Sequence, residues 1–400
     1  MLFIRIEIRR HAFYLNGAKI TIRGAISHFV KNEGNTMIFM YLAVLLRSPS
    51  LVSLPCTATI LFSTVKVSLQ IPEHMPGEVD QKLLNFTAMN VHKTVLITGG
   101  TGLIGQAITK ALLEKNYSII ILTRDPSKHT VTNENISYAK WDVKSQFIDV
   151  DAVKKSDCII HLAGANVGDK RWTQKRKKEI ADSRVKSGEL LVKVLSENSN
   201  TVKTVISASA IGWYGPDKFS VDKEFTESDA AYSDFLGQTC AQWERSIEPV
   251  AQLNKRLVKL RTGIVLANEA GALPGFKLPL RFGIAAILGS GRQVISWIHI
   301  DDLARAYIYA IENENLKGTY NVVAPFPVTN KQLTLGLAKA VNKSFFIPIQ
   351  VPSFALKIAL GEMSIEVLKS ATVSCKKLQA ERFTFLYPHI DAAIRQLTTK

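Results

Sequence analysis

Short apolar runs alternate with helical patterns from residue 93 to beyond the middle of the chain. The runs are rich in Val, Ile and Thr, which favours strands. They lie at 94–98, 118–122, 158–164, 204–209 and 257–266, with a further one leading to Trp141 and Asp142. Strands separated by helical segments predict an α/β fold with a doubly wound parallel sheet.

Residues 1–88 follow a different pattern. The segment 3–9 alternates with a period of two, unlike the period near 3.6 of an amphipathic targeting helix. The apolar piece 37–46 is too short to span a membrane, and 48–65 is interrupted by two prolines. We therefore expect a poorly ordered extension with no core of its own and no stable membrane insertion. The pattern leaves open whether residues 1–88 belong to the natural protein, and Met89 is a candidate start.

A glycine-rich turn joins the run 94–98 to a helical pattern over 107–114. Glycines at 99, 102 and 105 permit a tight turn, close approach of a pyrophosphate to the backbone, and close packing of helix against strand. The helix N-terminus behind them favours negative charge. The pattern predicts a dinucleotide-binding loop that comprises Gly99, Thr101, Gly102, Leu103, Ile104 and Gly105.

The end of the second strand indicates which dinucleotide binds. Thr123 stands about where an NAD-binding domain carries an acid for the ribose 2′-hydroxyl. Arg124 follows, and its guanidinium suits a 2′-phosphate. The pattern favours NADP over NAD, with Asp125 as the competing acid and a solvated turn arginine as the alternative role of Arg124.

Composition adds charge to this picture. The chain has 50 Lys and Arg against 34 Asp and Glu, a formal net charge of +16, which favours anionic ligands. A basic run at 170–178 has no helix-turn-helix signature, RNA-recognition motif or interleaved aromatics beside it, so we predict a phosphate- or carboxylate-bearing small molecule and no nucleic acid. The four cysteines, Cys56, Cys158, Cys240 and Cys375, have no disulfide or metal-site spacing. This predicts a reducing, cytoplasmic compartment and no metal.

Several motifs together resemble the extended short-chain dehydrogenase/reductase superfamily. They are GGTGLIG at 99–105, HLAG at 161–164, SASAIGWYG at 207–215 and WIHIDDLA at 297–304. More narrowly, RW at 171–172, SR at 183–184, GSGRQ at 289–293 and LGEMS at 360–364 look like its small "epimerase family" branch of NADP-dependent oxidoreductases, related to nucleotide-sugar epimerases. The resemblance covers about 93–400. It implies that NADP(H) is held by the glycine loop, Thr123, Arg124, Leu162, Ala163, Gly164, Glu179 and Arg184.

The same resemblance suggests how the chain divides. Residues 89–265 would form an NADP-binding Rossmann domain, to which 297–330 returns, and 331–400 a small C-terminal domain. Between them, 266–296 is rich in Gly and Pro and carries Arg281 and Arg292. We expect a substrate lid there, with arginines that could hold phosphate or carboxylate.

The chemistry departs from the superfamily's pattern. Its Tyr-x-x-x-Lys pair, which moves a proton as the cofactor moves a hydride, would fall on Phe235 and Thr239 here. A literal match at 214–218 lies in a Gly/Pro turn, where the Lys would not sit one helical turn from the phenol. Tyr214 remains the candidate acid, with Tyr232 as an alternative. Ser209 could bind a substrate carbonyl, or it could satisfy the backbone at a strand end.

These patterns support two functions of different classes. The first is an NADP(H)-dependent oxidoreductase or epimerase acting on an unknown small molecule, with Ser209 and Tyr214 in catalysis. The second is a cofactor-binding sensor or scaffold that lost catalysis, as Phe235 and Thr239 suggest. The sequence leaves the substrate and the oligomeric state open.

Overall fold

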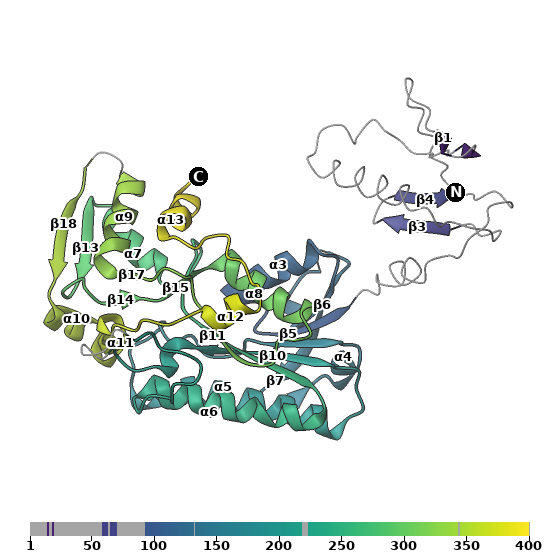
Figure 1. Cartoon of the computed structure of the whole chain (residues 1–400). Helices are drawn as coiled ribbons and strands as arrows, with labels where there is room; N and C mark the ends of the chain where they lie inside the picture. Colours follow the sequence, from purple (N-terminus) through teal and green to yellow (C-terminus); the bar gives the residue numbers. More distant parts are fainter. Residues whose placement is uncertain are drawn as a thin grey trace. The chain divides into compact units, whose positions relative to one another are not determined.

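The computed structural model describes four short strands near the N-terminus and residues 93–399 except 132, 218–222 and 343–344. The chain divides into two compact units, Met1–Val91 and His92–Lys400. In the first unit, β1 (Tyr14–Leu15) pairs antiparallel with β2 (Ala18–Lys19), and β3 (Ala58–Phe62) with β4 (Val65–Leu69) (Figure 1). The rest of the segment 1–88 lies outside the described residues, so its poor order stays a prediction.

An eight-stranded sheet forms the centre of the second unit, in the order β16-β11-β10-β9-β5-β6-β7-β8. Every neighbouring pair is parallel except β7 and β8. The strands are β5 (Thr94–Thr98), β6 (Ser118–Thr123), β7 (Ile136–Asp142), β8 (Phe147–Ile148), β9 (Cys158–His161), β10 (Thr204–Ala210), β11 (Arg256–Thr262) and β16 (Gly318–Val322). The predicted doubly wound parallel sheet is confirmed. Its strand order reverses at β5, the place where α/β folds bind ligands.

Helices cover both faces of this sheet (Figure 1). On one face α3 (Leu103–Leu113) and α8 (Ile300–Glu312) pack against alternate strand residues, and on the other α4 (Val150–Lys154) and α5 (Gln174–Glu197) pack against the residues between them. The helix α6 (Phe235–Ile247) lies beside α5. Three short 3-10 turns, η2 (Pro126–Lys128), η3 (Ile211–Trp213) and η4 (Glu248–Leu253), connect these elements. In the central strands β5, β6, β9 and β10, successive residues are therefore buried on both faces.

A smaller lobe with its own core follows the sheet. It contains α7 (Leu273–Leu280), β13 (Ile284–Leu288), α9 (Asn330–Asn342), β18 (Ile347–Val351) and α13 (Ile390–Thr398). The pairs are β13 with β18, β14 (Val294–Ile295) with β17 (Val328–Thr329), and β12 (Ile264–Leu266) with β15 (Trp297–His299). Further short helices are α10 (Ser353–Leu360), η5 (Gly361–Met363), α11 (Ser364–Leu368) and α12 (Lys376–Ala380).

The segment 266–296, for which we expect a substrate lid, forms regular elements of this lobe, and its role as a lid stays a prediction. It supplies α7, β13 and β14, and Leu273 and Ala285 are fully buried in the lobe's core together with Leu337 of α9. Gly283, Gly289 and Gly291 lie in turns between regular elements, whereas Gly275 lies within α7. Among the described residues, no helix combines the length and the apolar character needed to cross a bilayer.

Candidate functional site

The glycine loop lies at the end of β5 and leads into α3. Gly99 has a φ of +70°, and a Cβ atom on it would lie 3.1 Å from the backbone carbonyl carbon of Leu162. A Cβ on Gly105 would lie 2.4 Å from the carbonyl oxygen of Gly99. Gly102, in contrast, is exposed, and it begins α3 without a side-chain cap. The turn is therefore packed tightly beneath and left open above, where the free N–H groups of the helix N-terminus favour an anion.

A residue that sequence reasoning missed ties this loop to β9. Thr98 is fully buried, and its hydroxyl oxygen accepts the backbone N–H groups of Leu162 at 3.0 Å and Ala163 at 3.1 Å. The signal was a polar residue at the end of an otherwise apolar strand. Because the two amides already donate to Thr98, they fix the β9 turn beside Gly99 and are not available as donors to a ligand.

Arg124 and Asp125, in the turn after β6, differ in their partners. The carboxylate of Asp125 accepts the hydroxyl of Ser127 at 2.6 Å and lies 3.2 Å from the ammonium of Lys128, which together hold the pKa of Asp125 below its usual range. Thr123 is hydrogen-bonded to His129 at 3.2 Å. Arg124 is exposed and has no ion pair among the described residues. The competing acid is thus engaged within its own turn, whereas the guanidinium is available.

Arg184 and Glu179 occupy different surroundings on α5. Arg184 lies beside the β9 turn, where a Cβ on Gly164 would meet its guanidinium carbon at 3.1 Å, and it donates to the carbonyl oxygen of Ala165 at 3.0 Å. Burial lowers its pKa. Glu179 instead accepts a hydrogen bond from Arg176 at 2.8 Å and has a side chain 60% exposed. The structure brings Arg184 to the loop that faces Gly99, whereas the carboxylate of Glu179 is engaged by Arg176.

Three of the six cations in the basic run 170–178 are paired within the fold. Besides Arg176, Lys178 pairs with Asp182 at 2.9 Å, and Lys177 pairs with Glu362 of η5. Ion pairing of this kind reduces the field that a nucleic acid would meet. Among the described residues, no group of His, Cys, Asp or Glu has the arrangement of a metal site.

Both predicted catalytic residues lie in one buried hydrogen-bond network. Ser209 donates to Glu244 at 2.7 Å, and Arg261 donates to the same carboxylate through Nε at 2.7 Å and Nη2 at 3.0 Å. Arg261 also donates to the hydroxyl of Tyr214 at 3.0 Å, which in turn donates to Asn321 at 2.7 Å. At most 6% of any of these five residues is exposed.

The network determines what the Tyr214 hydroxyl can do. Burial raises the pKa of Tyr214 to about 12. Its oxygen accepts from Arg261 and its proton is donated to Asn321, and the residue has no exposed surface. A substrate would have to displace one of these partners to reach the phenol. The roles of Tyr214 and Ser209 as catalytic residues stay predictions.

Phe235 and Thr239, which stand where the superfamily has its Tyr-x-x-x-Lys pair, lie at the start of α6. Phe235 packs its ring edge-on against Trp172 at 5.0 Å, and the hydroxyl of Thr239 donates to the carbonyl oxygen of Phe235 at 2.7 Å. Lys369, from the smaller lobe, lies 3.3 Å from the carboxylate of Asp234, which caps α6. An ammonium therefore does approach this helix start, but from a distant part of the chain that spacing rules could not reveal.

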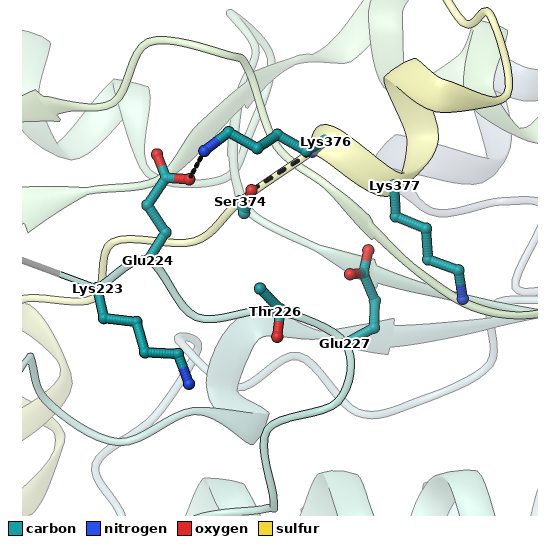
Figure 2. A pocket seen from close by; sticks show the side chains of 7 residues that line it. All are labelled: Lys223, Glu224, Thr226, Glu227, Ser374, Lys376 and Lys377. Atoms are coloured by element: carbon teal, nitrogen blue, oxygen red, sulfur yellow. Dashed lines mark hydrogen bonds and ion pairs between the residues drawn. The ribbon is translucent and has the colours of Figure 1, made fainter.

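A hollow of about 610 Å³ opens beside β16, which lies four strands away from β5 in the sheet order. Lys223, Glu224, Thr226, Glu227, Ser374, Lys376 and Lys377 line it. Figure 2 shows Lys376 extended to Glu224, with which it pairs at 2.8 Å, and Lys377 donates to the carbonyl oxygen of Thr319 at 2.7 Å. Lys223 pairs with Asp229 at 3.0 Å, so all three lysines that line the hollow already have partners within the fold. The hollow is therefore a poor site for an anion.

Comparison with known proteins agrees with this geometry. The profile of the NAD dependent epimerase/dehydratase family matches residues 95–235 and 283–323, and that of a domain of unknown function (DUF1731) matches 351–397. An epimerase family protein of Staphylococcus saprophyticus is 37% identical over 305 residues, which cover 76% of this chain and 99% of the relative. One of Mycobacterium leprae is 34% identical over 307 residues, covering 76% and 96%.

Solved structures give the same result. The human epimerase family protein SDR39U1 (isoform 2), crystallised with NADPH, has a TM-score of 0.65 and 27% identity, covering 76% of this chain and 99% of that one. A nucleoside-diphosphate sugar epimerase from Corynebacterium glutamicum has a TM-score of 0.61 and 31% identity, covering 80% and 62%. The chain belongs to the epimerase family, within the extended short-chain dehydrogenases/reductases.

Proposed function

We propose that this chain is an NADP(H)-dependent oxidoreductase or epimerase that acts on a small molecule. One observation carries the proposal: the glycine turn is packed tightly against β9, while Gly102 and the uncapped start of α3 remain open. The neighbouring strand β6 is followed by Arg124, which is exposed and has no ion pair within the part of the chain that the structure describes. The NADPH in the crystals of the human relative supports the choice of cofactor. When bound, the nicotinamide would supply a hydride donor or acceptor.

The residues present fit such a cofactor. The first turn of α3 would bind the pyrophosphate through backbone N–H groups, and Arg124 would pair with the 2′-phosphate. Thr98 holds Leu162 and Ala163 in place beside the turn, and Arg184 holds the segment after them. Each of these groups binds or orients, and none moves a proton.

Replacing Arg124 by Ala should weaken NADPH binding selectively. The change removes a charged hydrogen bond worth about 1.5–3 kcal/mol, or about 10- to 100-fold in Kd, and should leave NADH binding nearly unchanged. Fluorescence titration with both cofactors measures this. Lys110→Ala, an exposed charge further along α3, is the matched control and should change neither affinity. Equal losses for NADPH and NADH, or a wild-type preference for NADH, would show that Arg124 has another role.

A sensor or scaffold without catalysis is the second candidate, favoured by Phe235 at the place of the tyrosine and by the burial of Tyr214. The two candidates differ in turnover. The enzyme should oxidise or reduce at least one member of a panel of carbonyl compounds and alcohols with NADP(H). A protein that binds NADPH tightly and turns over none of the panel is the sensor.

Tyr214→Phe tests the predicted proton donor. If the phenol transfers the proton, turnover should fall by about 10²–10⁴-fold with the NADPH affinity unchanged. We expect instead that turnover by the folded protein is retained and that stability falls by about 1–3 kcal/mol, because Arg261 and Asn321 each lose a buried partner. Turnover measured well below the variant's melting temperature separates these results.

A further inference from the structure

The strands β13 and β18 form a small sheet in which β13 has one buried and one more open face, while residues 347–350 of β18 are all exposed. Ala285 and Ile287 of β13 are 0% and 8% exposed, and Ala285 packs in the core that α7 and α9 share. Figure 1 shows these two helices on the same side of the sheet. Because side chains alternate along a strand, Ile284, Ala286 and Leu288 lie on the opposite face.

The second strand extends this open face with further apolar residues. The parallel register places Ile347 beside Ile284 and Ile349 beside Ala286, and Ile347 and Ile349 are 50% and 43% exposed. No charged side chain stands on this face of either strand. In a water-soluble sheet such positions are normally polar, so a wholly aliphatic face points to a partner.

Exposed aromatic residues flank the two strands. Phe282 precedes β13 and is 78% exposed, and Phe345 precedes β18 and is 72% exposed. Immediately after β18, α10 exposes Phe354 and Ile358 by 67% and 71%. With Ile347 and Ile349, these side chains present roughly 700 Å² of apolar surface, close to the about 800 Å² that each partner buries in a standard protein interface.

A second copy of this chain is the partner that fits the face best. A two-fold interface needs a surface that is complementary to itself, and an uncharged aliphatic face meets that condition without matched charges. Each copy carries a formal net charge of +16, so two copies repel each other wherever basic groups meet. The β13–β18 face is a region where they can approach closely.

Two other modes of self-association are less suited to this chain. The backbone N–H of Ile347 donates to the carbonyl oxygen of Gly283, on the side of β13. Because the direction of the backbone groups alternates along a strand, those of Pro348 and Gln350 face the free edge of β18, and Pro348 has no N–H to donate. The free edge is therefore a poor template for strand pairing. The exposed residues of the long helices α5 and α6 are all polar or charged, which does not suit a helical dimer interface.

We propose that two copies of this chain associate by packing the open faces of their β13–β18 sheets against each other about a two-fold axis. The apolar side chains of the two faces interdigitate as in a sheet-on-sheet core. Added salt screens the repulsion between the basic copies, so it tightens this association rather than weakening it. The interface does not involve the glycine loop, and the inference does not depend on the proposed function.

Sedimentation of the full chain over a range of concentrations tests the proposal. The wild type should form a dimer at micromolar concentration, with a Kd that decreases as salt increases. The double variant Ile347→Lys/Ile349→Lys should raise the Kd by about 100-fold or more, because it places four like charges in one desolvated interface. Phe282→Lys, on a separate segment, should act in the same direction.

The matched control is Val131→Lys/Phe147→Lys, which replaces residues that are 57% and 48% exposed on the nucleotide-binding half. This variant should dimerise as the wild type does. Thermal melts and NADPH titrations confirm that all variants are folded. A monomeric wild type at these concentrations, including one that binds lipid vesicles instead, would overturn the proposal. An Ile347→Lys/Ile349→Lys protein that dimerises with the wild-type Kd would also overturn it.

Discussion

Replacing Glu244 by Ala should lower the free energy of unfolding by about 3–5 kcal/mol, because it leaves a buried charge without its partner. Arg261 is 3% exposed and donates two hydrogen bonds to this carboxylate, and Ser209 donates a third. Burial by itself lowers the pKa of Arg261, but the hydrogen bonds and the charge of Glu244 raise it overall. The guanidinium therefore stays charged and cannot escape the penalty by losing its proton.

Denaturant titration with linear extrapolation measures this loss. Glu312→Ala is the matched control, because Glu312 pairs with Lys115 at 2.8 Å and the two side chains are 41% and 48% exposed. Such a surface pair contributes up to about 1 kcal/mol. The double variant Glu244→Leu/Arg261→Met, which removes both charges, should recover part of the stability. A Glu244→Ala protein as stable as the control would mean that Arg261 reaches water or another carboxylate.

The hydrogen-bond network around Arg261 could not be predicted from the sequence, although the strands that carry it could. Apolar runs predicted the central strands to within a few residues, because a strand buried on both faces has a local signature. Whether the Tyr214 hydroxyl is free depends on Asn321, which is 107 residues away, and on Arg261 of another strand. No local pattern reports a contact at that distance. Arg261, a charge within the strand pattern 257–266, was the available signal, and it does not reveal its partner Glu244.

Composition was a weaker guide to the segment 266–296. Its glycines and prolines did not reveal the regular elements that it contains. Pro274 stands in the first turn of α7, where a missing N–H costs nothing, and Gly289 and Gly291 form turns with φ of +58° and +70°. These residues begin a helix or form turns between regular elements, and they do not make the segment irregular. In contrast, the glycine loop was predictable because the three glycines act through their spacing within one turn.

Gly105→Ala should abolish measurable NADPH binding, with a loss of at least about 100-fold, and should destabilise the fold by about 1–3 kcal/mol. The added methyl group would lie 2.4 Å from the carbonyl oxygen of Gly99 and 2.5 Å from the Cα of Gly100. Both are backbone atoms that cannot rotate away, so the whole turn must shift from α3. The expected readouts are an NADPH fluorescence titration and a denaturant melt of the same protein.

Alanine variants of two other glycines distinguish an effect on packing from an effect on cofactor binding. Gly275 of α7 has no atom within 4 Å of an added Cβ, so Gly275→Ala should keep NADPH affinity and change stability by up to about 1 kcal/mol in the favourable direction. Gly102 has a φ of −81° and its nearest atom at 3.4 Å, so Gly102→Ala should fold normally. It should nevertheless bind NADPH more weakly, because the methyl group would occupy the surface that the pyrophosphate approaches. If Gly102→Ala and Gly105→Ala both bound NADPH with wild-type affinity, the cofactor would have to lie elsewhere, and the β5–α3 turn would be only a packing device.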